Sequence, residues 1–247
     1  MPFTFSHPAA AVPLARWGLP ISALAVGSMA PDFPYFLLLS TERQFAHSLV
    51  GVFVFCVPAS LAVLWLWHRV LDVPLNALLP SRFRCDIAKT RFHFGPSRRF
   101  SLIIVAIICG ALTHLAWDSF THANGFMASH WNWLQTSLYH GAHGTLRLCK
   151  VLQHASSVGG LILVLHWLRR AAKVEPDEPT HKSVAALLCV GSFVGAFGYA
   201  MWRQTALQQP KIEAFARDFA VMGVMILLVE ISLWSVWWRA RNQPYNF

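Results

Sequence analysis

The stretch Thr113-His114-Leu115-Ala116-Trp117-Asp118-Ser119-Phe120-Thr121-His122 lies at the end of a long apolar run. His114, Asp118 and His122 follow one another at intervals of four residues, and each such step along an α-helix turns only about 40° for a rise of about 6 Å. The three side chains therefore share one stripe of a helix. An aspartate at the centre of a membrane helix costs about 2.5 to 3.5 kcal/mol, so we interpret this stripe as a candidate functional site.

The composition around this stretch is typical of a protein embedded in a membrane. The 247 residues are 55% hydrophobic and only 13% charged, with a mean hydropathy of +0.46. Apolar runs near 48–68, 101–121, 148–168, 184–202 and 218–238 each approach the roughly 20 residues that a helix needs to cross a bilayer. We predict an all-α polytopic helix bundle with five full spans, forming one domain over 1–247, in which 1–170 carry the candidate site and 171–247 add two spans.

The N-terminal apolar region, residues 9–40, is unlike a single straight transmembrane helix. It contains two charged residues, Arg16 and Asp32, and several helix breakers, Pro13, Gly18, Pro20, Pro31 and Pro34. We expect a broken or re-entrant helical hairpin here, with its backbone buried among the other helices. This expectation matters for the site, because a complete span would place His7 and His47 on opposite faces of the membrane.

The distribution of charge predicts the orientation in the membrane. The connection 69–99 is rich in lysine and arginine, whereas 123–146 contains no Lys, Arg, Asp or Glu. Basic loops stay in the cytoplasm, so we expect the first connection inside, the second outside and the C-terminus cytoplasmic, in a multi-pass protein of a bacterial inner membrane. The net charge of +9 is then a topology signal, which argues against nucleic acid as a partner. The five scattered cysteines indicate neither a disulfide framework nor a thiolate metal site.

With this orientation, candidate metal ligands from separate segments meet at the outer face. The set comprises five imidazoles and two carboxylates: His7, Asp32, His47, His114, Asp118, His122 and His154. Such donors suit zinc, and also manganese or iron, with one ion or two. Two alternatives remain open at this point. His114 and Asp118 can form a hydrogen-bonded pair that fixes helix packing, and His154 can belong to a polar stripe of its own helix.

Three cationic residues lie near these candidates in sequence. Arg43 precedes His47 by four residues, Lys150 precedes His154 by four, and Arg147 lies one turn further out. Snorkelling toward lipid headgroups is their ordinary role. Beside a metal they could also bind a substrate phosphate. Glu230, midway along the last span, is another costly group for which the sequence names no partner.

Four segments resemble a bacterial family of uncharacterised integral membrane proteins, a domain of unknown function. These segments are Pro2-Phe3-Thr4-Phe5-Ser6-His7-Pro8, Gly27-Ser28-Met29-Ala30-Pro31-Asp32-Phe33, Ala46-His47-Ser48 and the stretch quoted above. The resemblance covers most of residues 1–170. That family is similar to the membrane-bound metal-dependent hydrolases, and more distantly to zinc-dependent phospholipase C and P1 nuclease.

The resemblance implies a set of zinc ligands. In the phospholipase C superfamily an early histidine, an aspartate, a second histidine and a His-x-x-x-Asp pair bind zinc, and the helix aspartate bridges two ions. The positions that match this order are His7, Asp32, His47, His114 and Asp118, with His122 or His154 as later ligands. The sequence departs from the pattern because it has no N-terminal tryptophan and because Val158 stands where a later carboxylate would follow His154. One or two zinc ions are therefore expected.

The chemistry that we expect is metal-assisted hydrolysis of a phosphoester, with Asp32 as the preferred proton acceptor and Asp118 as a ligand. A site at the height of the outer headgroups suggests a lipid phosphate as substrate and membrane lipid as partner. The alternative class is a protein that binds or transports a divalent cation without catalysis. A transporter would place its ligands near the bilayer midplane, whereas these ligands gather toward one face.

Overall fold

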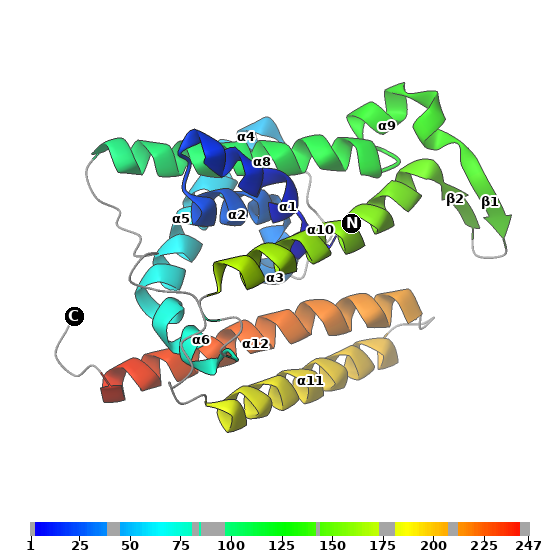
Figure 1. The fold of residues 1–247 in the computed structure, drawn as a ribbon. Coiled ribbons are helices and arrows are strands. Elements are labelled where there is room, and N and C mark those ends of the chain that lie inside the picture. Colours follow the sequence, from blue (N-terminus) through cyan, green and yellow to red (C-terminus); the bar gives the residue numbers. More distant parts are fainter. Residues whose placement is uncertain are drawn as a thin grey trace. The chain divides into compact units, whose positions relative to one another are not determined.

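The computed structural model describes residues 3–38, 45–80, 84, 97–141, 144–172, 181–206 and 212–242 (Figure 1). The chain forms two compact units. Unit 1 comprises Met1–Phe33, Glu42–Leu64 and His93–Leu168, and unit 2 comprises Pro34–Thr41, Trp65–Phe92 and Arg169–Phe247. The described candidate ligands all belong to unit 1.

Five helical segments are long and apolar enough to cross a membrane, as predicted. They are Leu49–Leu78, Ser97–His130, Leu148–Ala171, Lys182–Thr205 and Ala214–Asn242. The second contains α8 (Ser97–Thr121) and α9 (Phe126–His130), and the last three correspond to α10 (Leu148–Ala171), α11 (Lys182–Thr205) and α12 (Ile212–Asn242). The protein is therefore an all-α, multi-pass membrane bundle.

The first span is a continuous helix with two wider, π-helical turns. It contains α4 (Leu49–Gly51), η4 (Val52–Cys56), α5 (Val57–Leu66), η5 (Trp67–Leu71) and α6 (Asp72–Leu78). The π-helical turns η4 and η5 come shortly before Pro58 and Pro74. A proline ring clashes with the carbonyl four residues earlier, and a wider turn relieves that clash without ending the helix.

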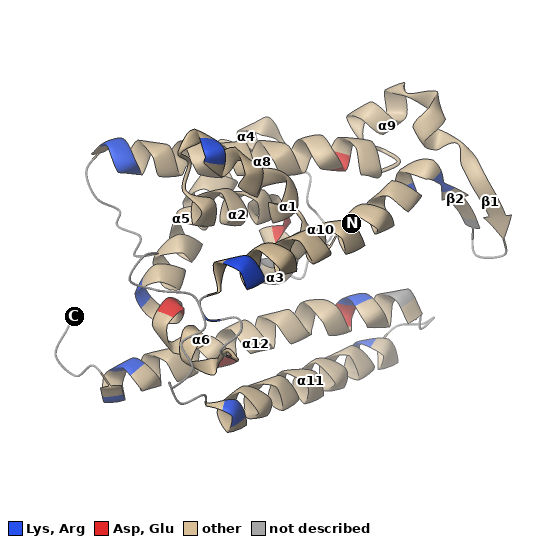
Figure 2. Cartoon of the chain, in the orientation of Figure 1, with Lys and Arg blue, Asp and Glu red and all other residues tan. Residues whose placement is uncertain are grey.

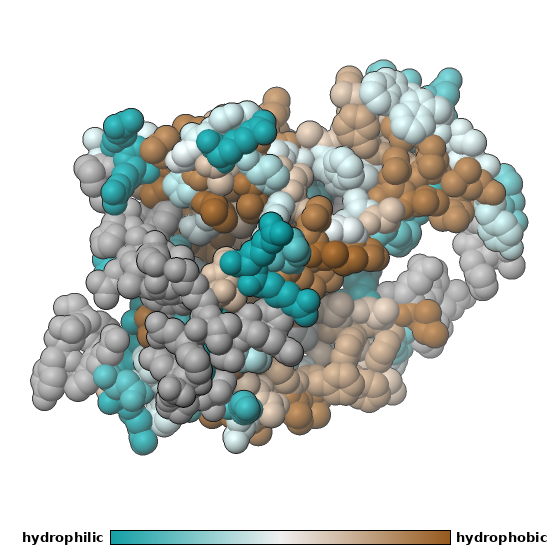
Figure 3. Space-filling model, viewed as in Figure 1, coloured by the Kyte–Doolittle hydropathy of each residue, from teal (hydrophilic) through white to brown (hydrophobic). Residues whose placement is uncertain are grey.

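The surfaces of the spanning helices are apolar, as contact with lipid requires. On α10 the side chains of Val158 and Ile162 are more than half exposed, and on α11 the same holds for Leu187 and Phe193. Figure 3 shows hydrophobic side chains at the surface over much of the face in view. Exposed apolar side chains along whole helices favour a hydrocarbon environment over water.

The N-terminal region is a broken hairpin, as predicted. It consists of η1 (Thr4–Ser6), α1 (Pro8–Ala11), η2 (Val12–Trp17), α2 (Ile21–Met29), η3 (Ala30–Asp32) and α3 (Phe33–Leu38). The chain reverses at Gly18, whose φ of 80° is readily adopted only by glycine. Since α2, the longest of these helices, has nine residues, none reaches the length of a span.

Two glycines hold the N-terminal hairpin against α8. A Cβ at Gly27 of α2 would collide with the backbone of Ile107, and a Cβ at Gly110 of α8 would collide with the carbonyl of Leu24. The two backbones therefore approach as closely as small residues permit. Leu24 and Ile107 are fully buried at this contact.

The uncharged connection after α8 contains structure that the sequence did not predict. It comprises α9, η7 (Asn132–Gln135) and an antiparallel pair of strands, β1 (Ser137–Gly141) and β2 (Gly144–Arg147). Its small core consists of Ala128, Leu134 and Cys149. Trp133 and Tyr139 are exposed. This pattern agrees with an aromatic segment at the membrane interface.

Unit 2 is built on the antiparallel pair α11 and α12. Phe193 and Phe197 of α11 meet Phe219 and Phe215 of α12 edge to face. At the other end of α12, Arg239 donates hydrogen bonds to the Val70 carbonyl and to Asp72.

Glu230 has a partner within unit 2. The hydroxyl of Ser192 on α11 donates to its carboxylate at 2.8 Å. The carboxylate of Glu230, which is unfavourable in the apolar part of the last span, is thus hydrogen-bonded to a residue of the neighbouring helix.

Candidate metal centre

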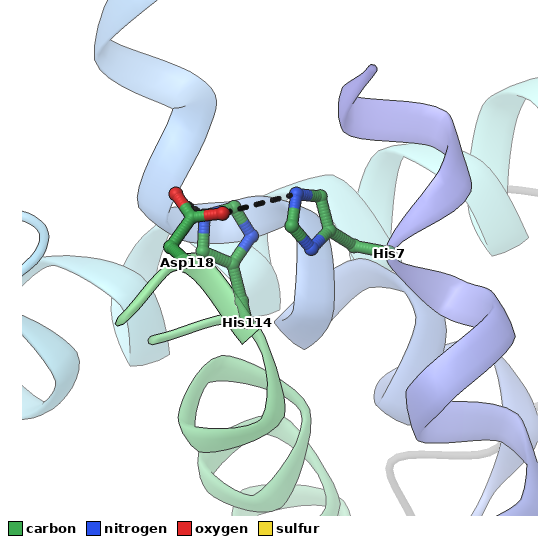
Figure 4. A group of neighbouring side chains, drawn as sticks. All are labelled: His7, His114 and Asp118. Carbon is green, nitrogen blue, oxygen red and sulfur yellow. Dashed lines mark ion pairs between the residues drawn. The ribbon is translucent and has the colours of Figure 1, made fainter. Parts of the chain in front are cut away.

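His114 and Asp118 project from one buried face of α8, as the four-residue spacing predicted. Both side chains lie in the interior of unit 1 with Gly110 and Thr121. The Nε2 atom of His114 is 3.4 Å from Oδ2 of Asp118. Figure 4 shows the two side chains directed toward the same point, with His7 approaching from the N-terminal segment.

The His114 ring is oriented by the backbone of α2. Its Nδ1 atom lies 2.8 Å from the carbonyl oxygen of Ser28. A carbonyl can only accept, so Nδ1 carries the proton and donates, which leaves the lone pair of the neutral ring on Nε2. Histidines that bind metals are commonly oriented in this way by a carbonyl on the far nitrogen.

Asp32 reaches the cluster from η3 and is completely buried. Thr4 donates a hydrogen bond of 2.7 Å to its Oδ2 atom. The other oxygen, Oδ1, lies 3.6 Å from Nε2 of His47 and 3.7 Å from Nε2 of His114. The hydroxyl of Thr4 thus holds one carboxylate oxygen and directs the other toward the two imidazoles.

His47 lies in the tight turn that precedes α4. The Ser48 hydroxyl donates to the carbonyl of Phe45 and accepts from the amide of Gly51, which fixes this turn as the N-cap of the helix. A side chain at Gly51 would collide with the Phe45 carbonyl. The His47 side chain remains 19% exposed, so the cluster has contact with its surroundings on this side.

The distances among the ligand atoms fit a first-row metal ion. The Nε2 atoms of His47 and His114 are 3.3 Å apart. Oδ1 of Asp32 completes one triangle with them, with edges of 3.6 and 3.7 Å. Oδ2 of Asp118 completes a second triangle on the same pair, with edges of 3.7 and 3.4 Å. Ligands about 2.0 to 2.2 Å from a tetrahedral zinc lie about 3.3 to 3.6 Å from one another, so both triangles approximate a face of such a site.

His7 brings a third imidazole to the cluster. Its ring stacks on that of His114, with centroids 3.8 Å apart, and its Nε2 atom lies 3.8 Å from Oδ1 of Asp118. Burial, followed by the neighbouring His114 ring, lowers the pKa of His7 from its ordinary 6.5 to about 3. The ring is therefore neutral near pH 7 and keeps a lone pair, as a metal ligand must. Within the described part of the chain, neither His7 Nε2 nor Asp118 Oδ1 has a hydrogen-bond partner.

His122 lies at the exposed end of the stripe. Its Nδ1 atom is 3.1 Å from the Asp118 carbonyl oxygen and 3.6 Å from Oδ2 of the same residue. Four histidines, His7, His47, His114 and His122, thus approach the Asp118 carboxylate within 3.4 to 3.8 Å. Asp118 is the centre of the arrangement, and the residues present fit a divalent ion.

The remaining predicted site residues lie elsewhere or outside the description. His154 is exposed on α10, and its neighbour Gln153 takes the buried position. Lys150 is exposed as well, and Arg147 on β2 donates to Gln135 at 2.9 Å. Arg43 lies outside the described residues. Two groups of ligand atoms agree with this site, since His7, His114 and Asp118, and likewise Asp32, His47 and His114, bring one ligand atom each to within 4.8 Å of one another.

Sequence reasoning missed the residues that orient the ligands. Thr4 lies in the opening segment quoted for the resemblance, but a threonine there carries no distinctive signal. Ser28 acts through its backbone carbonyl, which no sequence pattern reveals. Gln153, the buried polar residue of α10, carries no signal in the sequence either, because a glutamine next to a histidine on a helix does not show which of the two is buried.

The fold and the cluster together define a class, that of multi-pass membrane proteins with a buried histidine and aspartate site. The model of one protein family, described as a domain of unknown function (DUF4184), matches residues 1–236. The chain belongs to that family. No curated protein and no solved structure shows significant similarity to the chain.

Proposed function

We propose that this protein is a membrane-bound, metal-dependent hydrolase of phosphoesters, with zinc as the expected ion. The observation that carries the proposal is the convergence of four histidines on the Asp118 carboxylate, next to the buried Asp32. The Nε2 atoms of His7, His47 and His114 and the two carboxylates are enough donors for one or two zinc ions with three protein ligands each. The resemblance to the zinc-dependent phospholipase C superfamily agrees with the same chemistry.

An ion held there would supply Lewis acidity, lowering the pKa of water and neutralising charge on a phosphoryl group. His114, fixed by the Ser28 carbonyl, and Asp32, fixed by Thr4, hold the ion-binding atoms in place. A carboxylate oxygen that does not bind the ion would accept the proton of the attacking water. The sequence favoured Asp32 for this role. Asp32 suits this role because the Thr4 hydroxyl binds its Oδ2 and leaves Oδ1 directed toward His47 and His114, while Asp118 serves as a ligand.

The place of the cluster along α8 supports a substrate at one membrane surface. Arg98 and Arg99 lie at the start of this helix, and twenty residues separate Arg98 from Asp118, a rise of about 30 Å. That length equals the thickness of the hydrocarbon core. Figure 2 shows the basic and the acidic residues of α8 toward opposite ends of the helix. With basic residues on the cytoplasmic side, the cluster lies at the outer headgroup level, where a lipid phosphate is the nearest phosphoester.

Metal analysis of the purified protein is the first test. Wild-type protein in detergent should contain one or two zinc ions per chain, and Asp118→Asn should lose most of them, because the carboxylate is central to the ligand set. Asp218→Asn is the matched control, since Asp218 is an aspartate of α12 paired with Arg217 outside the cluster. Wild-type protein without bound metal would overturn the proposal.

Activity is the second test. Metal-loaded protein should release phosphate or a phosphorylated headgroup from phospholipids in mixed micelles, and Asp118→Asn should abolish the release. Bound metal without hydrolysis, combined with cation flux in proteoliposomes, would favour the transport alternative.

A further inference from the structure

Gln153 of α10 directs its side-chain amide into unit 1. This side chain is only 1% exposed. Both its Oε1 and its Nε2 lack a hydrogen-bond partner within the residues that the structure describes. A buried amide with neither group paired is strongly unfavourable, and such groups in native proteins commonly mark the place of an occupant.

Contacts one turn to either side of Gln153 join its part of α10 to the segments that carry the ligands. Before it, Cys149 belongs to the small core of Ala128 and Leu134, against which Leu152 and the neighbours of His122 in sequence, Phe120 and Ala123, also pack. After it, Ser157 accepts a hydrogen bond from the Phe3 amide at 3.0 Å. Gln153 therefore lies on the part of α10 that covers the end of α8 and the start of the N-terminal segment, both of which supply the cluster.

The N-terminal segment joins this part of α10 directly to the ligands. Thr4, next to Phe3, binds Asp32, and His7 lies beside Asp118. A side chain at Gly160 would meet the carbonyl of Ser6, so α10 also approaches this segment closely at Gly160. The side of α10 that carries Gln153 and Gly160 is buried, whereas His154 points away from it.

We propose that Gln153 binds an oxygen of the substrate's phosphate group in the metal centre. The amide NH2 donates to an anionic phosphoryl oxygen, and the amide oxygen accepts from a hydroxyl of the phosphate or of its ester. A neutral amide adds this recognition without a further negative charge beside Asp32 and Asp118. The proposal rests on the proposed function, and it gives Gln153 the phosphate-binding role that the sequence had suggested for Lys150 on the same helix.

Stability and phosphate affinity, measured together, test this role. Gln153→Leu replaces the amide by an apolar side chain of similar size. In metal-loaded protein we expect affinity for inorganic phosphate, measured by calorimetry, to fall roughly tenfold, because a hydrogen bond to a charged group is lost. Metal content should stay at the wild-type value. The melting temperature should stay equal or rise, since an unpaired buried amide is removed. His154→Leu is the matched control and should change none of these quantities.

A second arm identifies the source of the phosphate. Short-chain phosphatidic acid in the detergent micelle should show the same loss of affinity in Gln153→Leu if the ligand is a lipid headgroup. If Gln153→Leu lowers the affinity for inorganic phosphate but not for phosphatidic acid, the natural ligand is a soluble phosphate compound. Unchanged affinity in both arms would overturn the proposal and leave only a structural water at the amide. A variant that melts at lower temperature and loses metal would also overturn it, because Gln153 would then be structural.

The outcomes separate this inference from the function on which it rests. Wild-type protein that binds no metal overturns the proposed function and the role of Gln153 together. Wild-type protein that binds metal and phosphate, with Gln153→Leu indistinguishable from it, overturns the role of Gln153 alone. The conservative variant Gln153→Asn, which keeps the amide on a shorter side chain, should recover part of the phosphate affinity.

Discussion

The Nδ1 atom of His114 lies 2.8 Å from the carbonyl oxygen of Ser28, so a side chain of α8 is oriented by the backbone of α2. This contact is available only because Gly27 and Gly110 let the two helices approach closely. The orientation of the central histidine therefore depends on packing at Gly27, next to Ser28, and at Gly110, one turn before His114, and mutation can test this dependence.

Replacement of Gly27 by alanine should weaken metal binding without touching a ligand. The new methyl group would collide with the backbone of Ile107, which forces the helices apart and costs about 1 to 3 kcal/mol of stability. Metal affinity, measured by competition with a chelator, should fall about tenfold or more as the Ser28 contact lengthens. Gly159→Ala on α10 is the control, because nothing lies within 4 Å of the position that its new methyl group would take. Equal affinity in the two variants would contradict the proposed dependence.

The hydroxyl of Thr4 should also matter to metal affinity. Thr4→Val keeps the shape of the side chain and removes the hydrogen bond to Oδ2 of Asp32. We expect affinity for zinc to fall by about 10-fold to 100-fold, the usual effect of losing a group that orients a ligand. Thr4→Ser, which retains the hydroxyl, should restore most of it. If valine and serine behave alike, Thr4 contributes packing alone.

The lowered pKa of His7 predicts a pH dependence of stability. Because burial lowers the pKa of this imidazole to about 3, the folded protein keeps it neutral, whereas the unfolded chain takes up a proton as the pH falls through 6.5. The contribution of neutral His7 to the free energy of unfolding is therefore complete above pH 6.5 and decreases progressively as the pH falls from 6.5 toward 3. At about pH 5 the loss attributable to His7 is about 2 kcal/mol.

Thermal unfolding of the chelator-treated protein in detergent measures this effect. His7→Phe retains a ring that can stack on His114 but cannot titrate. Between pH 7 and pH 5 the variant should lose less stability than the wild type does. If stability depends on pH in the same way in the wild type and in His7→Phe, then His7 is not buried in its neutral form.

The pair formed by Ser192 and Glu230 should stabilise unit 2 and leave the metal centre unaffected. Its hydrogen bond of 2.8 Å joins α11 to α12 within the apolar part of both helices. Hydrogen bonds of this kind in membrane proteins couple by about 0.6 kcal/mol on average and by up to about 1.7 kcal/mol. A double-mutant cycle of Ser192→Ala and Glu230→Leu, each of which removes the hydrogen bond, should give a coupling in that range. Metal content should remain at the wild-type value throughout, and a loss of metal would assign Glu230 to the site.

The sequence by itself determined the membrane class, the five spans and the stripe on α8. Long apolar runs dictate helices because unpaired backbone groups are too costly in a bilayer, and four-residue spacing places His114 and Asp118 on one side of any α-helix. The breakers between residues 9 and 40 likewise predicted a broken hairpin, and the structure has short helices over the described residues of this region. These are local consequences of the chain, independent of how the segments pack.

The sequence also proposed His7, Asp32 and His47 as partners of the stripe, but only the tertiary structure decided which of the proposed residues meet and at what distances. His7, Asp32 and His47 come from segments far apart in sequence, and their approach to Asp118 and His114 depends on the contact of α2 with α8 and on the turn before α4. On α10 the sequence favoured His154, but the packing of this helix on Phe3–Ser6 buries Gln153 instead. Adjacent residues of a helix point about 100° apart, so Gln153 and His154 cannot both face the same neighbour. Which of the two is buried depends on the segments that pack against α10, and the sequence of α10 alone does not determine it.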